Sequence, residues 1–471
     1  MRRSTLLLAS LASLLVAACS ASPGGRAEAP SGGAGMAGGD AAYDGSPRMM
    51  AAPPAMASED ASGVNRTAAA PSEEPALLAP SAVSPGKVAV ATDVPRPTGF
   101  AGVRAGEWDD NANYRDFLGY IKNSAGLGIE KIDVQNRRFI VVQDKDGNGV
   151  PSCQVTVREA QGQKTATLTT AASGRAVLFP HAYGLGTALI AKTSCARSAA
   201  VETVFDATDG DGVVSLKLPV SRADVSKPAV DVVFILDTTG SMSEEIEGVK
   251  STLKAVLSGL DQSVKIRVGL VEYKDREDSF VTKTYPLTSD VRSLSSSIAG
   301  ISAQGGGDTP EDVNSGLSVA VSQMQWNDKA VARLAFLIAD APPHLDYQDG
   351  TPYAQSAKKA AEKGIKVFTV AASGMDNQGQ AVFRQIAQVT GGTNMFVLRG
   401  GAGPQSTGGG DPTSSCGATH QNYSSGKLDQ LIVGKINMEV VSLKADPMRI
   451  PGLQKDENAK ACGDRVLIVA R

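Results

Sequence analysis

The chain has 471 residues, a formal net charge of −3 and 42% hydrophobic residues, which is enough for two or more folded units. Such a weak and mixed charge argues against a nucleic-acid-binding protein, because that function needs a basic surface. The three histidines, His181, His344 and His420, lie far apart in the sequence without the spacing of zinc ligands, so a zinc enzyme is not expected.

The N-terminus carries an export signal in residues 1–19. Arg2 and Arg3 precede a short apolar stretch, and small residues lead to Cys19. The run Leu-Val-Ala-Ala-Cys-Ser at 15–20 resembles the lipoprotein box of bacterial lipoproteins. This resemblance implies cleavage before Cys19, acylation of that cysteine and a lipid-anchored place in the bacterial cell envelope. The absence of Asp at position 20 favours the outer membrane or cell surface. The alternative is an ordinary secreted protein in which the cysteine is incidental.

Residues 20–97 are rich in Ala, Gly, Pro and Ser, without a sustained period. Such a composition cannot bury enough apolar surface to offset chain entropy, so a disordered tether is expected. Residues 98–134 are predicted to form a short helical segment, since Tyr114, Phe117 and Ile121 have helical spacing. The acidic cluster that begins at Asp109 is interpreted as a solvated helix start, with a calcium site as the alternative.

Residues 135–226 contain short β-rich runs separated by turns, which predicts a small β-sandwich. The stretch 144–151, Asp-Lys-Asp-Gly-Asn-Gly-Val-Pro, resembles the first hairpin of carboxypeptidase-regulatory or transthyretin-like modules. It also matches the first half of a calcium-binding loop. However, Val155 stands where that loop needs a bidentate Glu, so we interpret the stretch as a turn.

Four cysteines remain if Cys19 is acylated, and an even number in an exported protein favours disulfides. Cys153 and Cys195 lie in the predicted sandwich, whereas Cys416 and Cys462 lie near the chain end. Pairing within each region is the simplest arrangement. Zinc binding by these cysteines is not expected, because their spacings are too wide.

Residues 228–400 alternate apolar strands with helical patterns, which predicts an α/β fold with a doubly wound, mostly parallel sheet. Its first strand, around 232–236, runs into Asp237, Thr239 and Ser241 at the carboxyl end, where open α/β sheets bind ligands. One carboxylate and two hydroxyls are hard oxygen donors that suit Mg²⁺. Alternatively, Ser241 and Glu244 form a helix-capping box without any metal.

Asp-x-Thr-x-Ser after an apolar strand resembles the metal-ion-dependent adhesion site of von Willebrand factor type A domains. In this resemblance, which spans about 230–398, Thr309 matches the fourth ligand and Asp340 the fifth. The runs 305–312, Gly-Gly-Gly-Asp-Thr-Pro-Glu-Asp, and 339–344, Ala-Asp-Ala-Pro-Pro-His, are similar to the type A domains attached to atypical alpha-kinases. No kinase-like segment follows, so kinase activity is not expected.

The resemblance implies that Mg²⁺, or Mn²⁺ or Ca²⁺, is held by these five residues and completed by an exposed Asp or Glu of a partner protein. The expected function is adhesion or assembly of a complex by a non-enzymatic, envelope-anchored protein. Two alternatives are a structural envelope scaffold with a fold-stabilising metal and a metal-assisted hydrolase. The hydrolase is less favoured, because the chain lacks Gly-x-Ser-x-Gly, His-Glu-x-x-His and phosphate-loop motifs.

Residues 401–471 begin with a loop rich in Gly, Ser and Thr, and a helix is predicted over 428–441. A final strand is predicted over 465–470. Its partner is left open, and joining the β-sandwich is one option.

Overall fold

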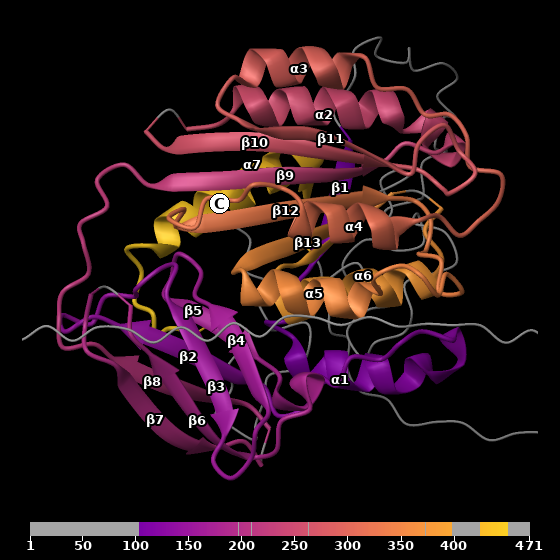
Figure 1. Ribbon diagram of the computed structural model, residues 1–471. Helices are drawn as coiled ribbons and strands as arrows, with labels where there is room; N and C mark the ends of the chain where they lie inside the picture. The colour runs from indigo at the N-terminus through magenta and orange to yellow at the C-terminus, as the bar shows by residue number, and fades with distance from the viewer. Residues whose placement is uncertain are drawn as a thin grey trace, which may run out of the picture. The chain divides into compact units, whose positions relative to one another are not determined.

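The computed structural model describes residues 103–397 and 424–450, except 196, 209, 262 and 373. Its main feature is an eight-stranded sheet in the order β11-β10-β9-β12-β13-β14-β1-β15, with helices on both faces (Figure 1). The strands are β1 (Arg104–Trp108), β9 (Ala229–Asp237), β10 (Lys265–Tyr273), β11 (Thr282–Thr288), β12 (Ala332–Ala339), β13 (Ile365–Ala371), β14 (Asn394–Val397) and β15 (Ser424–Lys427). The five strands from β10 to β14 in this order are parallel to one another. The outer strands β11, β1 and β15 pair antiparallel with their neighbours. The predicted doubly wound, mostly parallel α/β fold is therefore confirmed.

The helices divide into two groups, one on each face of the sheet. The first group is α2 (Ile246–Ser258), α3 (Val291–Ala299) and α7 (Leu428–Ser442), and the second is α1 (Tyr114–Asn123), α4 (Val313–Ser322), α5 (Tyr353–Glu362) and α6 (Asn377–Thr390). Among the described residues, no helix combines the length and apolar character that crossing a bilayer requires.

The central part of strand β9, Val232 to Leu236, is apolar because both of its faces are covered. Val232 and Phe234 pack in the core beneath α2, α3 and α7, whereas Val233 and Ile235 pack in the core beneath α4, α5 and α6. All four are fully buried. Burying side chains of this size contributes roughly 1.5 to 3 kcal/mol each, so this strand is anchored in both cores and its carboxyl end is fixed in place.

The N-terminal part of this unit departs from the sequence-based expectation. Residues 98–134 were expected to be helical only, but they also contain β1, which pairs with β14 and extends the sheet beyond its predicted last strand. The acidic cluster is not simply solvated, because Asp110 is 2% exposed and its carboxylate contacts Arg384 of α6 at 2.7 and 2.9 Å. A five-residue strand is too short to show a clear period, and its pairing is set by β14 and β15, which are far away in sequence.

The second unit of the described chain is a β-sandwich, as predicted. One sheet has the order β5-β2-β8 and the other β4-β3-β6-β7. The strands are β2 (Arg138–Gln143), β3 (Gln154–Glu159), β4 (Thr165–Thr169), β5 (Arg175–Leu178), β6 (Ala188–Thr193), β7 (Val201–Asp206) and β8 (Gly212–Lys217). Cys153 and Cys195 form the predicted disulfide, and Cys153 is completely buried in the core of this unit.

The predicted turn at the start of this unit is formed by Asp144. One oxygen of its carboxylate accepts hydrogen bonds from the backbone N–H groups of Asp146 and Asn148, at 2.9 and 2.8 Å. The other oxygen accepts from the backbone of Arg222 at 3.1 Å. Burial alone would raise the pKa of Asp144, but the hydrogen bonds together outweigh it and lower the pKa from its ordinary value. Cys19, Cys416, Cys462 and the predicted strand 465–470 lie outside the described residues.

Candidate metal centre

The turn after β9 is organised by the carboxylate of Asp237, which is fully buried. One oxygen accepts hydrogen bonds from the backbone N–H of Thr239 at 2.9 Å and from its hydroxyl at 2.7 Å. The other accepts from the Tyr273 hydroxyl at 3.2 Å. Because each carboxylate oxygen has a donor that fixes its position, Asp237 holds the Thr239 hydroxyl in a defined place.

A second carboxylate reaches the same turn from β12, the parallel neighbour of β9. The Ser241 hydroxyl donates to Asp340 Oδ1 at 2.9 Å and lies 3.1 Å from the Thr239 hydroxyl. The structure therefore brings together four of the five residues predicted from the sequence. The capping-box alternative does not hold, since Ser241 bonds to Asp340 and α2 begins only at Ile246, without a side-chain cap.

The fifth predicted residue, Thr309, lies on the glycine-rich loop, residues 305–312, and is exposed. This loop is docked on the Asp237 turn, because Gly305 O accepts a hydrogen bond from the N–H of Gly240 at 2.7 Å. Gly306 has a φ of +67°, and a Cβ at this position would lie only 3.0 Å from Thr239 Cβ. Glycine thus allows the loop to approach the turn closely. Among the described residues, no hydrogen bond joins the Thr309 side chain to the other four.

Sequence analysis missed Glu311, although it lies two residues after Thr309. Glu311 is 1% exposed, and a Cβ added to Gly306 would lie 2.6 Å from its Oε1. Its backbone bonds to the loop after β12, donating to Pro342 O and accepting from His344 N, both at 3.0 Å. Its Oε2 is buried without a hydrogen-bond partner among the described residues. The sequence did show a glutamate within the glycine-rich motif. Only the backbone pairing between the two loops shows that this glutamate is buried beside the Asp237 turn.

Burial raises the pKa of three acidic groups here, and the charge of Asp237 adds to the effect at the other two. Burial raises the pKa of Asp237 to about 6, against hydrogen bonds from Thr239 that lower it. Burial, followed by the charge of Asp237, raises the pKa of Asp340 to about 7. The same two causes raise the pKa of Glu311 to about 8. The positive charge of Lys274 offsets part of the negative charge of Asp237 and lowers its pKa. The Lys274 ammonium donates to Thr238 O and Gln304 O, so it also bridges the turn and the glycine-rich loop.

This set of side chains fits a divalent cation. It offers hydroxyl and carboxylate oxygens, the donors that hard cations prefer. The buried Glu311 Oε2 lacks a donor within the part of the chain that the structure describes, and an unpaired buried polar atom is costly. A positive charge would compensate the three carboxylates of Asp237, Asp340 and Glu311. We therefore treat the carboxyl ends of β9 and β12, with the glycine-rich loop, as a candidate metal centre.

Comparison with known proteins agrees with this geometry. Residues 231–402 match the family described as the von Willebrand factor type A domain. This part of the chain is a type A domain. Such a domain supports a role in protein interaction or adhesion, and type A domains are generally interaction modules rather than catalysts. The matched residues include all five predicted metal ligands.

Two curated relatives share part of this sequence. The alpha-protein kinase vwkA of Dictyostelium discoideum is 32% identical over 153 residues, which cover 31% of this chain and 23% of the kinase. The putative ariadne-like RING finger protein R811 of Acanthamoeba polyphaga mimivirus is 28% identical over 120 residues, covering 25% of this chain and 12% of that protein. The chain thus spans less than a quarter of the length of either relative.

Solved structures with similarity to the chain include BatB from Bacteroides thetaiotaomicron, at 18% identity and a TM-score of 0.30, covering 45% of this chain and 99% of that one. Proximal thread matrix protein 1 from the mussel byssus has 12% identity and a TM-score of 0.26, covering 31% of this chain and 37% of that one.

Proposed function

We propose that the type A domain binds a partner protein through a divalent cation, Mg²⁺ in the first instance, whose coordination is completed by an Asp or Glu of the partner. The observation that supports this most strongly is that Asp237 and Asp340 accept hydrogen bonds from Thr239 and Ser241, whose hydroxyl oxygens lie 3.1 Å apart. Three of these oxygen-bearing side chains belong to the turn after β9 and the fourth, Asp340, follows β12, so two distant segments converge at the carboxyl edge of the sheet.

The residues of the chain would hold the ion in two ways, by direct contact and by orienting the contacting groups. The neutral hydroxyls of Thr239 and Ser241 would contact it, while Asp237 and Asp340 orient these hydroxyls by accepting their protons in hydrogen bonds. Thr309 would join from the glycine-rich loop when a ligand is present. Bound in this way, the cation supplies a position that an outside carboxylate can occupy. Such a charge-assisted contact is strong where water is excluded.

The test is selection of peptides on the immobilised full-length chain in Mg²⁺. The selected peptides should carry an Asp or Glu whose change to Asn or Gln abolishes binding, and EDTA should release them. The double variant Thr239→Ala with Asp340→Ala should bind none of them. Asp328→Asn serves as the matched control, because Asp328 is exposed and lies before β12, at the end of that strand opposite Asp340. Unchanged binding by the double variant would refute the proposal.

The two alternative functions, a structural scaffold and a metal-assisted hydrolase, predict different results. A fold-stabilising metal in a scaffold protein predicts a melting temperature that rises with Mg²⁺ while no acidic peptide is selected. A metal-assisted hydrolase predicts cation-dependent turnover of ester, peptide or phosphate substrates.

We also propose that the chain is a lipoprotein of the bacterial cell envelope, anchored through Cys19. The sequence at 15–20 supports this, and the disulfide between Cys153 and Cys195 fits an oxidising compartment. Labelled palmitate should be incorporated into the wild type and the Ser20→Ala control but not into Cys19→Ala. Equal labelling of Cys19→Ala would exclude an anchor at this cysteine.

A further inference from the structure

A second group of metal-ligating side chains lies beside the candidate centre and is not used by it. Asp275 follows β10, Asp308 lies on the glycine-rich loop, and His344 lies in the loop after β12. One ligating atom from each of these residues lies within 4.8 Å of those from the other two. Asp275 and His344 are buried, whereas Asp308 is exposed and leaves the group open to solvent.

The imidazole of His344 is oriented like that of a metal ligand. Its Nδ1 lies 2.8 Å from Asp346 Oδ1, and because a carboxylate can only accept, this contact places the proton on Nδ1. A histidine that binds a metal through one nitrogen usually donates the other N–H to such a carboxylate. The lone pair of a neutral ring is then on Nε2, which is available for a cation.

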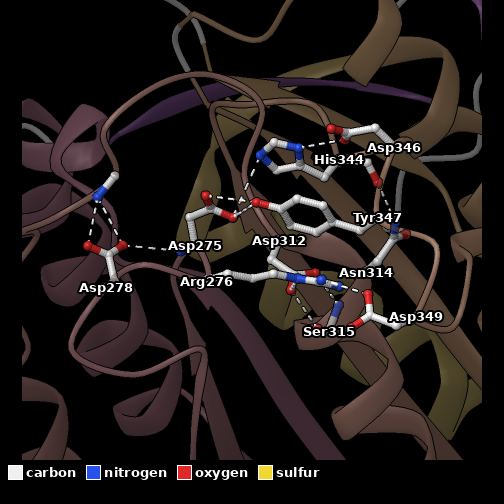
Figure 2. Close-up of polar contacts among 11 residues, drawn as sticks. Asp275, Arg276, Asp278, Asp312, Asn314, Ser315, His344, Asp346, Tyr347 and Asp349 are labelled. Carbon is white, nitrogen blue, oxygen red and sulfur yellow. Dashed lines mark hydrogen bonds and ion pairs between the residues drawn. The ribbon is translucent and has the colours of Figure 1, made fainter. Parts of the chain in front are cut away.

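Among the described residues, the only group that faces Nε2 at ion-pair distance is the Asp275 carboxylate. The His344 side chain is 7% exposed, and Nε2 is buried without a hydrogen bond to any residue that the structure describes. It faces Asp275 Oδ1 at 3.6 Å (Figure 2). A lone pair and a carboxylate that face each other inside a protein are unfavourable unless a positive charge lies between them. The alternative is a proton on Nε2, which would form an imidazolium–carboxylate pair.

The two buried ligands are held rigidly by Tyr347. Its ring stacks on the His344 imidazole with centroids 3.9 Å apart and an angle of 8°, and the Arg276 guanidinium lies 3.7 Å from the ring centroid. Figure 2 shows the tyrosine between these two side chains. The Tyr347 hydroxyl lies 2.9 and 3.0 Å from the two oxygens of Asp275. A single aromatic residue therefore positions both His344 and Asp275, so that they form a preorganised pair.

We propose that Asp275, Asp308 and His344 form a second cation site, which takes a divalent metal that binds imidazole well, such as Zn²⁺. One imidazole and two carboxylates match the ligands of Zn²⁺, and water can fill the fourth position. An imidazole ligand favours such metals over Mg²⁺, which prefers oxygen ligands. The site is distinct from the one in the proposed function and does not depend on it, although Asp308 and Thr309 are neighbours on one loop.

The experiment is calorimetric titration of the untagged, chelator-treated full-length chain with Zn²⁺. His344→Gln should weaken Zn²⁺ binding at least tenfold, and Asp346→Asn should weaken it roughly 10- to 100-fold, because Asp346 orients the ligand. His181→Gln is the matched control and should leave affinity unchanged. Its Nδ1 also contacts a carboxylate, Asp133 Oδ2 at 3.3 Å, but it does not belong to the cluster.

Two further measurements keep the result interpretable. Asp308→Asn changes an exposed side chain, so weaker Zn²⁺ binding in this variant cannot be attributed to loss of the fold. Ser241→Ala removes a ligand of the first site only and should retain Zn²⁺ binding, so failure of the proposed function would not imitate failure here. With only three histidines in the chain, ¹⁵N-histidine NMR should show the Nε2 resonance of His344 shifting on Zn²⁺ addition.

The opposite outcomes would overturn the proposal. Wild-type Zn²⁺ affinity in both His344→Gln and Asp308→Asn would show that any bound zinc lies elsewhere. A His344 ring that carries protons on both nitrogens at neutral pH, unchanged by Zn²⁺, would identify the cluster as an imidazolium–carboxylate pair.

Discussion

Replacing Asp340 by asparagine should affect stability in opposite directions with and without metal. The amide oxygen of the new side chain can still accept the hydrogen bond that Ser241 donates at 2.9 Å, but one negative charge is removed. Two hydroxyls connect Asp340 to Asp237. Two charges roughly 6 to 8 Å apart repel by roughly 2 to 3 kcal/mol at an effective dielectric constant of about 20. This is the upper limit of the stabilisation expected for Asp340→Asn in EDTA, because the raised pKa values leave both groups only partly ionised.

With saturating Mg²⁺ the wild type should instead be more stable than Asp340→Asn. A ligand at one hundred times its dissociation constant stabilises the native state by about 2.7 kcal/mol, or roughly 5 to 10 °C for a unit of this size. The wild type should show this gain, whereas Asp340→Asn should lose most of it. Differential scanning fluorimetry in EDTA and in Mg²⁺ measures both effects, with Asp328→Asn as the control that follows the wild type. A variant that is less stable than the wild type in EDTA, or that gains as much from Mg²⁺, would refute the reasoning.

Three more predictions concern the scaffold around the site. Asp110→Ala leaves the charge of Arg384 buried without its carboxylate and should destabilise the protein by about 3 to 5 kcal/mol in chemical denaturation. Cys153→Ser opens a disulfide across 42 residues and should cost about 4 kcal/mol, measured in the same way. Gly316→Ala in α4 places a Cβ 2.6 Å from a buried tyrosine ring and should destabilise the protein. Gly119→Ala in α1 meets no described residue within 4 Å and should stabilise it by up to about 1 kcal/mol.

Each of these three predictions has a result that would contradict it. For the buried ion pair of Asp110 and Arg384, the comparison is Glu202→Ala, which breaks an exposed pair with Lys192 at 3.9 Å. This control should change stability by less than about 1 kcal/mol. Equal losses in the two variants would mean that burial of the pair is unimportant. Loss of the disulfide should have the same effect as reducing the wild type, and a larger loss would indicate packing damage. Similar effects of the two glycine substitutions would show that α4 can move away from the tyrosine.

The local pattern of the sequence was sufficient to predict the α/β fold, because strand β9 is apolar on both faces and is followed by a helix with regular apolar spacing. It also predicted the β-sandwich and the pairing of Cys153 with Cys195. The predicted ligands Asp237, Thr239, Ser241 and Asp340 lie together because each follows a strand of one parallel sheet. Parallel strands place their carboxyl ends at the same edge, so position in the sequence translated directly into position in space.

Contacts between distant segments could not be predicted in this way. Strand β1 belongs to the sheet only because β14 and β15 pair with it, and Asp110 is buried in an ion pair with Arg384, which is 274 residues away. The inward position of Glu311 and the placement of His344 opposite Asp275 likewise depend on how three loops pack together. Periodicity records which face of an element is buried. The pairing of single polar groups across loops depends on the complete fold, so only the tertiary structure decided it.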